Sequence, residues 1–525
     1  MRLPGRSAGN AAIAALVIMA ACERAPLPAA PGATPTIDAG VDGGGSDALG
    51  PDGGADAGRA PPLDFGIPIG GQVSPTVAGA THASAVVAVS DGAAVVGGNF
   101  IGTVSFAADR TLTDDGTGSG FVARFRRDQR LAWVTELHGD EVEVSDMAGL
   151  GNDEVVAVGW FAGTLRIDLP GGTLLAAASR GGLDAFAARF AADGSVRWLT
   201  TGGGPGDDIA RVVTALVSGT DGSALIALTG AVGDAVVFGS GATAVGPSAP
   251  GSGPIYVARL DGYGGVRSVS FAGGGVPGQG YGIAIDGLGA TVATGFVNGP
   301  ASFGTSLSGA PVTVDPGVGR AFVARWDVSA GLAWALPFAG PNGEGDAVAI
   351  GADGEILACG QFEDQAAFGS GAGAPRLTAD SPGSQGTYLL ALDAGGGTLW
   401  ARRFAGIGTR PWRLRAAPGG AWLVAGWFGG GVLLDPDGPS PAKLFSMGGN
   451  EAMFVRLTPD GALDWAFAGG GPGDDEGFDL AAATDGSSWA VGDYAGPATF
   501  GAAGASVTLD SGTDGNGFLL HLGSR

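Results

Sequence analysis

The sequence contains few of the residues that carry common enzymatic or metal chemistry. Its 525 residues include three histidines and two cysteines, with no His-Glu-x-x-His, no Gly-x-Ser-x-Gly and no paired cysteines. The usual zinc and serine-hydrolase signatures are therefore missing. We expect no metal site, no cofactor and no internal disulfide.

Positive charge and long apolar runs are also scarce. Lys and Arg number 27 against 51 Asp and Glu, which gives a formal net charge of −24. Such an acidic chain repels phosphate, so nucleic acid is not an expected partner. Residues 8–21 are almost wholly apolar, but this run is too short to span a bilayer unaided.

The N-terminus has the composition of a targeting segment. Arg2 and Arg6 precede the apolar run, and Met19-Ala20-Ala21-Cys22 closes it. These four residues resemble a bacterial lipobox, with Met19 where Leu is usual. The resemblance implies a signal peptide over residues 1–22, a lipid anchor on Cys22 and, because Glu23 follows, sorting to the cell outer membrane. An ordinary cleaved signal with an incidental Cys22 is the alternative.

Glycine and proline are abundant, and so are apolar residues. The chain holds 103 Gly and 31 Pro, yet 45% of its residues are hydrophobic and it has 11 Trp and 24 Phe. Apolar and aromatic residues at this level indicate a folded chain that turns often. Residues 23–60 are the exception, because they are mainly Pro, Ala, Gly and Asp with no apolar period. We expect them to be a disordered acidic tether.

An internal repeat of about 66 residues fills the rest of the chain. An aromatic or Met anchor recurs at Phe121, Phe186, Tyr256, Phe322, Tyr388, Met453 and Phe518. A second anchor follows about twelve residues later, at Trp133, Trp198, Ser268, Trp334, Trp400 and Trp465. Short alternating apolar runs bounded by Asp-Gly and Gly-Gly pairs lie between the anchors, and they predict antiparallel strands.

Each repeat holds about four strands. At about 66 residues it is longer than the usual WD40 or kelch repeat, and the additional residues lie between the second and third strands. Seven such sheets bury both faces by closing radially, so residues 61–525 are predicted to be an all-β, seven-bladed β-propeller of four-stranded antiparallel blades. The seventh repeat stops at His521-Leu522, one strand short. Residues 62–71, where Leu63-Asp64-Phe65-Gly66 matches Leu463-Asp464-Trp465-Ala466, are predicted to supply that strand and close the ring.

The recurring pattern resembles a known bacterial repeat. Asp-Gly, an apolar run, Gly-x-Phe, then Phe-Val-Ala-Arg, Asp-Gly, Trp and a Gly-rich turn ending in Asp are similar to the SBBP-type β-propeller repeat. That repeat occurs in exported and surface proteins, including lipoproteins abundant in myxobacteria. The resemblance covers residues 61–525, departs at Ser268 and Met453, and implies architecture and no single reaction.

Residues that recur at the repeat period are interpreted as structural. The Gly-Gly-Gly-Pro-Gly-Asp-Asp runs at residues 202–208 and 469–475 occupy the same place in two blades. We therefore expect Asp208, Asp346 and Asp475 to bond backbone amides in turns, with a metal loop as the alternative. The arginines that recur with the blade period are expected to be structural as well: Arg124, Arg189, Arg259, Arg325 and Arg456.

Residues that break the repeat are the candidates for a binding site. In blade six, Arg413 and Arg415 replace the small or acidic residues of the other innermost strands, and Arg410 and Trp412 lie beside them. If the strand lines the channel, the arginines face Asp146 and Asp479. A carboxylate or sugar site is one interpretation, and an internal salt bridge is the other. Trp160 and Trp427 are further candidates for glycan stacking, with packing between blades as their alternative.

Three classes of function follow. A surface-displayed binding lipoprotein is expected first, held to the membrane by its lipid anchor, monomeric, and with a protein or glycan as ligand. An envelope-assembly scaffold is the first alternative. A polysaccharide-acting enzyme is the second, since two carboxylates facing one pocket would suffice for it.

Overall fold

The computed structural model describes residues 60–69, 71–72, 79–114, 118–168, 174–218, 223–233, 235–239, 255–273, 277–315, 317, 320–340, 342–369, 373–406, 408–438, 441–502 and 505–524. All of them belong to the compact unit Gly50–Arg525. The predicted anchor Cys22, the signal segment and the tether up to residue 59 lie outside the described residues. Within the described part, no helix has the length and apolarity to cross a membrane.

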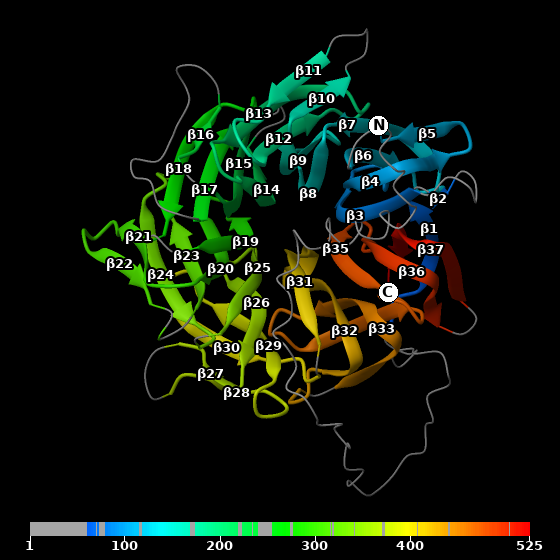
Figure 1. Ribbon diagram of the computed structural model, residues 1–525. Coiled ribbons are helices and arrows are strands. Elements are labelled where there is room, and N and C mark those ends of the chain that lie inside the picture. Colours follow the sequence, from blue (N-terminus) through cyan, green and yellow to red (C-terminus); the bar gives the residue numbers. More distant parts are fainter. Residues whose placement is uncertain are drawn as a thin grey trace, which may run out of the picture. The chain divides into compact units, whose positions relative to one another are not determined.

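Antiparallel pairing arranges the described strands in seven sets of four, which we call blades 1 to 7 (Figure 1). Further pairing joins some neighbouring blades into larger sheets. From blade 1 to blade 7, the innermost strands are β3 (Gly79–Ala88), β8 (Glu141–Gly149), β14 (Ile209–Val217), β19 (Gly278–Ile285), β25 (Glu344–Ile350), β31 (Arg410–Ala416) and β35 (Glu476–Ala482). The second strands are β4 (Ala94–Ala107), β9 (Val155–Ala162), β15 (Ala224–Ala231), β20 (Thr291–Val297), β26 (Ile356–Glu363), β32 (Trp422–Leu434) and β36 (Ser488–Ala502).

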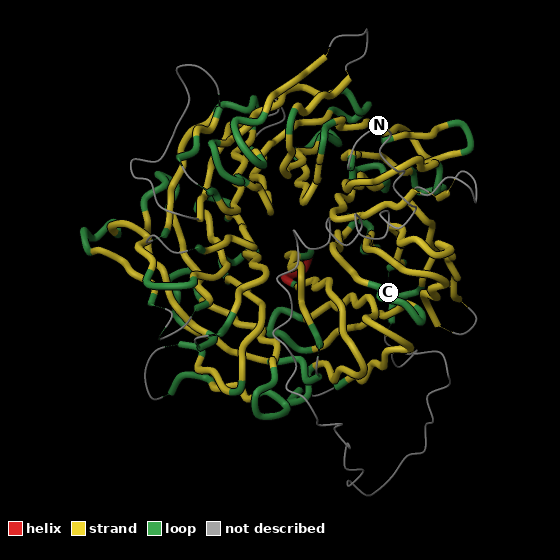
Figure 2. Tube along the Cα trace, viewed as in Figure 1, coloured by secondary structure: helices red, strands yellow, loops and turns green. Residues whose placement is uncertain are grey.

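The third and fourth strands complete the blades. The third strands are β6 (Ser119–Phe125), β12 (Asp184–Phe190), β17 (Ile255–Asp261), β23 (Ala321–Trp326), β29 (Gln385–Leu392), β33 (Ala442–Leu457) and β37 (Ala505–Leu522). The fourth are β7 (Leu131–His138), β13 (Val196–Gly203), β18 (Val266–Ala272), β24 (Leu332–Phe338), β30 (Thr398–Arg402), β34 (Leu463–Gly470) and β1 (Leu63–Ile69). One 3₁₀ turn, Pro418–Gly420, is the helical segment coloured red in Figure 2.

The blades follow one another around a common axis. Each innermost strand contacts the innermost strand of the next blade, from β3 through to β35, and β35 contacts β3 again. Strand β1 pairs with β37 as the outer strand of blade 7, with Gly66 opposite Leu520. The predicted β-propeller closed by an N-terminal strand is therefore present.

The hydrophobic core consists of seven clusters, one between each pair of adjacent blades. Because side chains alternate between the two faces of a strand, each strand contributes residues to two of these clusters. Phe121 and Ala123 pack between blades 7 and 1, and Val122 packs between blades 1 and 2. A strand with both faces covered in this way is apolar throughout, which explains the continuous runs in the sequence.

Tryptophans of the fourth strands in blades 1, 2 and 4 each bond to a backbone carbonyl of the next blade. The indole Nε1 of Trp133 donates to Ala192 O at 2.9 Å, and Trp198 repeats this bond to Gly262 O at 3.0 Å. Gly194, with φ of +85°, lies so close to the Trp133 ring that a Cβ there would be 2.7 Å from Cδ2. The Trp and Asp-Gly anchors recur together because they meet across a blade interface.

The extra length between the second and third strands forms outer hairpins and strand extensions. The separate short strands of these segments are β5 (Arg110–Thr113), β10 (Thr164–Asp168), β11 (Leu174–Ala178), β16 (Val237–Phe238), β21 (Ala301–Thr305), β22 (Pro311–Val314), β27 (Gln365–Ala367) and β28 (Arg376–Thr378). One more short strand, β2 (Gly71–Gln72), precedes β3 and pairs with β4. Several of these segments pair with the outer strand of the preceding blade, as β10 does with β7 and β16 with β13. The long repeat thus cross-links neighbouring blades.

Candidate functional site

The innermost strands share a β-bulge at the same register in all seven blades. The inserted residue differs in each blade, and the seven residues are Ser84, Ser145, Arg211, Tyr281, Asp346, Trp412 and Phe478. A bulge adds one residue to a strand and changes the direction of the side chains beside it. The scaffold is therefore conserved at this point while the side chains are not.

The predicted arginines and aspartates meet, with Asp146, Arg413 and Asp479 at the position after the bulge and Arg415 two residues beyond it. Arg415 lies 2.8 Å from Asp146 and 2.9 Å from Asp479, and Arg413 lies 3.6 Å from Asp146. These side chains come from blades 6, 2 and 7, so they meet at the axis. We call Asp146, Arg413, Arg415 and Asp479 the axial ion-pair cluster.

This cluster is buried and neutralised from within. The side chains of Asp146 and Asp479 are 0% exposed and that of Arg413 is 6% exposed. Each Asp also accepts a backbone N–H from the next blade, Asp146 from Val213 and Asp479 from Val86. Burial opposes ionisation of Asp479, but Arg415 and Arg413 hold its pKa below the ordinary value. The salt-bridge alternative given by the sequence describes this geometry.

Arg410 and Trp412 belong to a different cluster at the beginning of β31. Arg410 pairs with Asp346 at 2.9 Å, and its guanidinium carbon lies 4.9 Å from the Trp412 ring centre. Trp412 stacks at a tilt against Trp427, with ring centres 5.5 Å apart. The six residues predicted as one candidate site thus form two groups along the axis.

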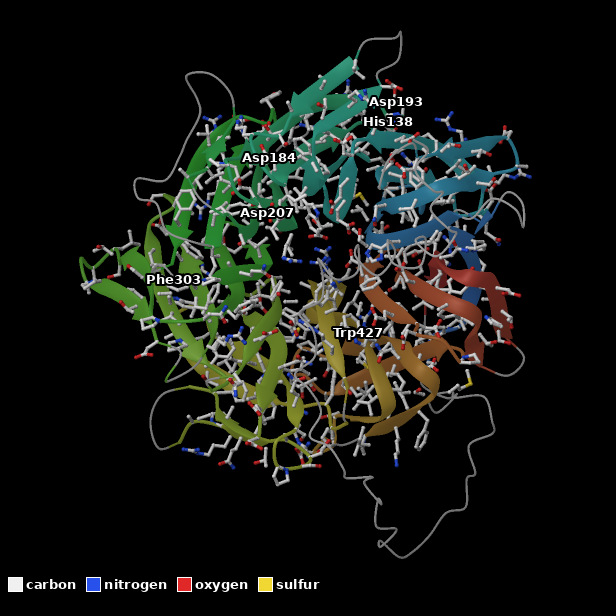
Figure 3. All side chains as sticks on the ribbon, in the orientation of Figure 1. His138, Asp184, Asp193, Asp207, Phe303 and Trp427 are labelled. Carbon is white, nitrogen blue, oxygen red and sulfur yellow. The ribbon has the colours of Figure 1, made fainter. Side chains whose placement is uncertain are left out.

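The second group extends across all seven blades at the amino ends of the innermost strands. We call it the amino-end cluster, and its members are His82, Glu143, Arg211, Tyr281, Asp346, Arg410, Trp412, Trp427, Phe478 and Asp493. Ring contacts link its aromatic members: Trp427 to Phe478 at 5.9 Å, Trp412 to Tyr281 at 6.2 Å and Phe478 to His82 at 4.8 Å. Figure 3 labels Trp427, which lies on β32 beside β31.

His82 is the titratable centre of this cluster. Its Nδ1 lies 2.5 Å from Asp493 Oδ2, and its Nε2 lies 3.8 Å from Glu143 Oε1. Burial by itself lowers the pKa of His82, but the carboxylates of Asp493, Glu143 and Glu476 raise it to about 9. Burial also raises the pKa of Glu143 to about 7, against the attraction of His82 and Arg211. Perturbed pKa values gathered in one place are typical of functional sites.

Sequence reasoning missed His82, Glu143, Arg211, Tyr281, Phe478 and Asp493. Under the assumption that every second residue of an innermost strand faces the channel, the sequence selects Asp146, Arg413 and Asp479, which follow the bulge. The inserted residue shifts the alternation by one position, so a different set of side chains shares a face before the bulge. The available signal was the change of residue type from blade to blade at these positions.

The two further tryptophans have different environments. Trp160, opposite Glu143 in blade 2, is 3% exposed, and Arg211 lies 5.8 Å from its ring centre. Trp160 is thus buried, as the alternative of packing between blades predicted. Trp427 is partly exposed and keeps a surface within the amino-end cluster.

The repeated Gly-rich turns are structural where the structure describes them. Asp208 accepts the N–H groups of Gly204 and Gly233, and Asp475 accepts those of Gly471 and Ala495. Asp346 was expected to do the same, and that prediction is wrong. It is the bulge residue of blade 5 and pairs with Arg410 instead, whereas Asp208 and Asp475 each lie three residues before the bulge residue of their blade. No group of His, Cys, Asp or Glu in the described ranges is arranged to hold a metal.

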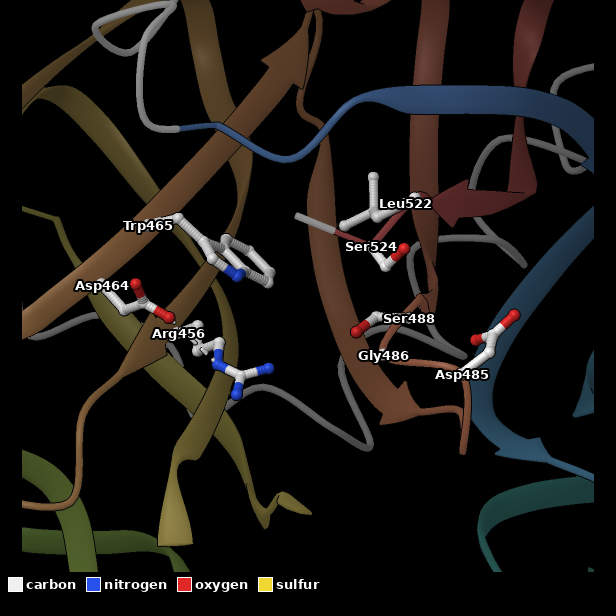
Figure 4. A pocket seen from close by; sticks show the side chains of 9 residues that line it. Arg456, Asp464, Trp465, Asp485, Gly486, Ser488, Leu522 and Ser524 are labelled. Carbon is white, nitrogen blue, oxygen red and sulfur yellow. Dashed lines mark ion pairs between the residues drawn. The ribbon is translucent and has the colours of Figure 1, made fainter. Parts of the chain in front are cut away.

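A cavity of about 520 Å³ lies at the opposite ends of the strands, between blades 6 and 7 (Figure 4). Arg456, Trp465, Asp485 and Leu522 are among its lining residues, and Arg456 pairs with Asp464 at 3.1 Å. Arg456 and Trp465 both belong to the sets that recur with the blade period. The cavity is therefore formed by scaffold residues.

Comparisons with known proteins return distant structural similarity. No family model matches the chain, and no curated protein sequence matches it. A calcium-binding protein, regucalcin, from Agrobacterium tumefaciens is 14% identical with a TM-score of 0.31, over 74% of this chain and 93% of that one. A gluconolactonase from Xanthomonas campestris is 12% identical with a TM-score of 0.29, over 74% and 98%. The β-propeller assignment rests on the strand pairing and the closed ring of contacts.

Proposed function

We propose that this protein is a membrane-anchored, surface-displayed β-propeller lipoprotein that binds a glycan at its amino-end cluster. One observation carries the proposal: side chains that differ from blade to blade gather where the innermost strands begin, on a backbone that is the same in all seven. Half-buried Trp412 and Trp427 supply ring surfaces there, and the partly exposed Arg410 supplies a charged hydrogen-bonding group. Aromatic surface beside polar groups suits a sugar, which has an apolar ring face and a hydroxyl rim.

The axial ion-pair cluster supports the same location for the ligand. Arg415 spans from blade 6 to Asp146 of blade 2, so its side chain crosses the axis next to the amino-end cluster. A ligand placed there would contact the axial ion-pair cluster, whose charges are already paired with one another. Rigid support of this kind lowers the entropic cost of binding.

Binding to immobilised glycans tests the proposal. Trp412→Ala and Trp427→Ala should each weaken binding by about thirtyfold, the loss typical of an aromatic residue that dominates an interface. Trp334→Ala is the matched control, because Trp334 is also partly exposed but lies on the outer strand of blade 4, where its Nε1 bonds Ala394 O. Unchanged binding by both variants would remove the amino-end cluster as the site.

The membrane anchor is a separate part of the proposal. The lipobox-like Met19-Ala20-Ala21-Cys22, the acidic tether and the SBBP-type repeat pattern support an exported lipoprotein of the outer membrane. Cys22→Ser should abolish metabolic labelling with a fatty acid and release the protein from the detergent-soluble membrane fraction. Labelling that persists in this variant would rule out acylation at Cys22.

Two alternatives remain testable beside binding. An envelope-assembly scaffold would face the periplasm, so protease treatment of whole cells would leave it intact. A polysaccharide-acting enzyme is favoured by one observation: the pKa of Glu143 near 7 is suited to a general acid. Release of reducing ends from a bound polysaccharide, lost in Glu143→Gln, would establish that activity.

A further inference from the structure

The turn between the third and fourth strands of a blade receives two side chains from the preceding blade. In blade 2, Ala192 O accepts from the indole Nε1 of Trp133 at 2.9 Å and from Arg124 Nη1 at 3.1 Å. Blade 3 repeats this arrangement at Gly262 O, with the corresponding tryptophan and arginine of blade 2 as donors. One backbone carbonyl thus accepts from both of the side chains that recur with the blade period.

Blade 7 is built without a continuous turn at this place, because its third strand β37 and its fourth strand β1 come from opposite ends of the chain. The bond from Gly523 N to Pro62 O, 2.7 Å, corresponds to the bond from Ala191 N to Ser195 O, 2.8 Å, at the base of the blade 2 turn. The Ala-Asp-Gly between Ala191 and Ser195 has no continuous counterpart between Gly523 and Pro62. The cavity of about 520 Å³ between blades 6 and 7 lies at this joint, with Gly523 and Ser524 in its wall.

Two donors of blade 6 border the cavity. Arg456 and Trp465 occupy the repeat positions of Arg124 and Trp133, and in Figure 4 they reach from blade 6 toward blade 7. Arg456 Nε is buried and lies 3.1 Å from an oxygen of Asp464, but it makes no hydrogen bond to Asp464 or to any other described residue. The Trp465 indole likewise makes no bond to blade 7 within the described ranges. Both side chains therefore face a space where blades 2 and 3 place a carbonyl.

The charges around the cavity favour a neutral acceptor. Asp464 and Asp485 line it together with Arg456, and Asp485 pairs with Arg127 of blade 1 at 2.8 Å. A carboxylate ligand would be repelled by both aspartates and would compete with Asp464 for the arginine. An amide carbonyl accepts the same hydrogen bonds without adding charge, as the turns of blades 2 and 3 do.

We propose that the cavity between blades 6 and 7 binds an Asp-Gly turn of a partner protein, with a backbone carbonyl of the turn accepting from Trp465 Nε1 and Arg456. The volume of about 520 Å³ lies within the range of ligand sites. The turn needs glycine, because Gly194 of blade 2 has a φ of +85° and a Cβ there would lie 2.7 Å from Cδ2 of the Trp133 ring. The cavity and the amino-end cluster lie at opposite ends of the strands, so this inference is independent of the proposed glycan site.

Nuclear magnetic resonance of the full-length protein in detergent, with ¹⁵N-labelled tryptophan indoles, tests the inference. The resonance of Trp465 is identified by its absence from Trp465→Phe. The peptide acetyl-Ala-Ala-Asp-Gly-Ser-amide, which has the sequence of residues 191–195, should move this resonance downfield in a saturable manner, because the indole N–H gains a hydrogen bond. The resonance of Trp133, which already donates to Ala192 O, should stay in place.

Two changes should weaken binding of the peptide. Replacing its Gly by Val should raise the Kd about tenfold, the cost of a left-handed backbone for a branched residue. Arg456→Gln should also raise the Kd about tenfold, through the loss of a hydrogen bond to a charged group. Arg325→Gln is the matched control, because Arg325 holds the same repeat position in blade 4, where it pairs with Asp286 at 2.5 Å. This control should bind the peptide as the wild type does.

The other indole resonances report whether each variant is folded, and if Arg456→Gln is not, the Val peptide on the wild type decides. A Trp465 resonance that stays in place at millimolar peptide would overturn the inference. Equal Kd values for the Gly and Val peptides, or for the wild type and folded Arg456→Gln, would do the same. Tighter binding of acetate than of the peptide at this resonance would assign the cavity to a carboxylate instead. The glycan site is tested separately, through Trp412 and Trp427.

Discussion

At the scale of single residues, the position after the bulge determines whether a blade contributes a small or a charged side chain near the axis. The residue after the bulge is Ala, Val or Gly in four blades, and it is charged in the other three, as Asp146, Arg413 and Asp479. The charged three come from blades 2, 6 and 7, and Arg415 completes their neutralisation. Buried charges persist only when they are paired and hydrogen-bonded, and this set satisfies both conditions.

Removal of the two arginines tests this assignment. Arg413→Ala with Arg415→Ala should lower the free energy of unfolding by about 3–5 kcal/mol, because it leaves Asp146 and Asp479 buried without a counter-charge. Adding Asp146→Asn and Asp479→Asn should recover much of the loss. Urea unfolding followed by tryptophan fluorescence measures both. A double variant as stable as the wild type would show that the arginines do not neutralise these aspartates.

At the scale of elements, closure of the ring depends on one strand. β1 covers β37, and its residues fill the end of blade 7: Phe65 stacks on His521 with ring centres 5.3 Å apart, and Asp64 Oδ2 lies 2.8 Å from His521 Nδ1. His521 occupies the place that Arg124 or Arg456 holds in other blades, so the closing blade substitutes a histidine for the recurring arginine. Gly523 N also donates to Pro62 O at 2.7 Å.

Deletion of residues 61–72 should destabilise the whole propeller. The deletion uncovers the β37 edge, which is then free to pair with another chain. Thermal unfolding should shift to lower temperature by at least several degrees, and light scattering should detect aggregates. Deletion of residues 25–55, within the predicted tether, serves as the control and should leave the melting temperature unchanged. Equal melting temperatures for the two deletions would contradict a closing role for β1.

At the scale of the whole molecule, buried acids dominate the dependence of stability on pH. Burial raises the pKa of Asp208, Glu143 and Glu451 to about 7 and that of Asp346 and Asp475 to about 6. Because these values exceed those of the unfolded chain, the folded state binds more protons between about pH 4 and 7. Their contribution to stability is therefore present at low pH and is lost as the pH rises. His521, whose pKa burial lowers, acts in the opposite direction, whereas His82, whose pKa burial lowers but its carboxylate neighbours raise to about 9, acts in the same direction as the acids. Aspartates with lowered pKa values, such as Asp193, lose their contribution only below about pH 4.

The urea midpoint should accordingly be higher near pH 5 than near pH 8. The double change Asp208→Asn with Glu451→Gln should flatten this slope, because amides do not ionise. Asp193→Asn is the control: Asp193 is exposed, and bonds from Ser195 lower its pKa, so the slope should persist. A wild-type midpoint that rises from pH 5 to pH 8 would contradict the dominance of the buried acids.

The sequence alone determined the architecture of the described chain. The repeat anchors are packing and turn residues whose chemistry is local: Trp133 meets Gly194 of the next blade, and Asp-Gly pairs make the turns. Seven copies of such a unit, with one strand missing at the end and supplied at the start, predicted the β-propeller and its closure by β1. The pairing of Arg413 and Arg415 with Asp146 and Asp479 was also foreseen as one alternative.

Only the tertiary structure decided which side chains share a site. The β-bulge shifts the facing of each innermost strand by one residue, and no residue type marks it, because the inserted positions range from Ser84 to Trp412. Closure of the ring then brings His82 of blade 1 between Asp493 of blade 7 and Glu143 of blade 2. Contacts across hundreds of residues depend on the register of the whole ring, which local patterns do not encode.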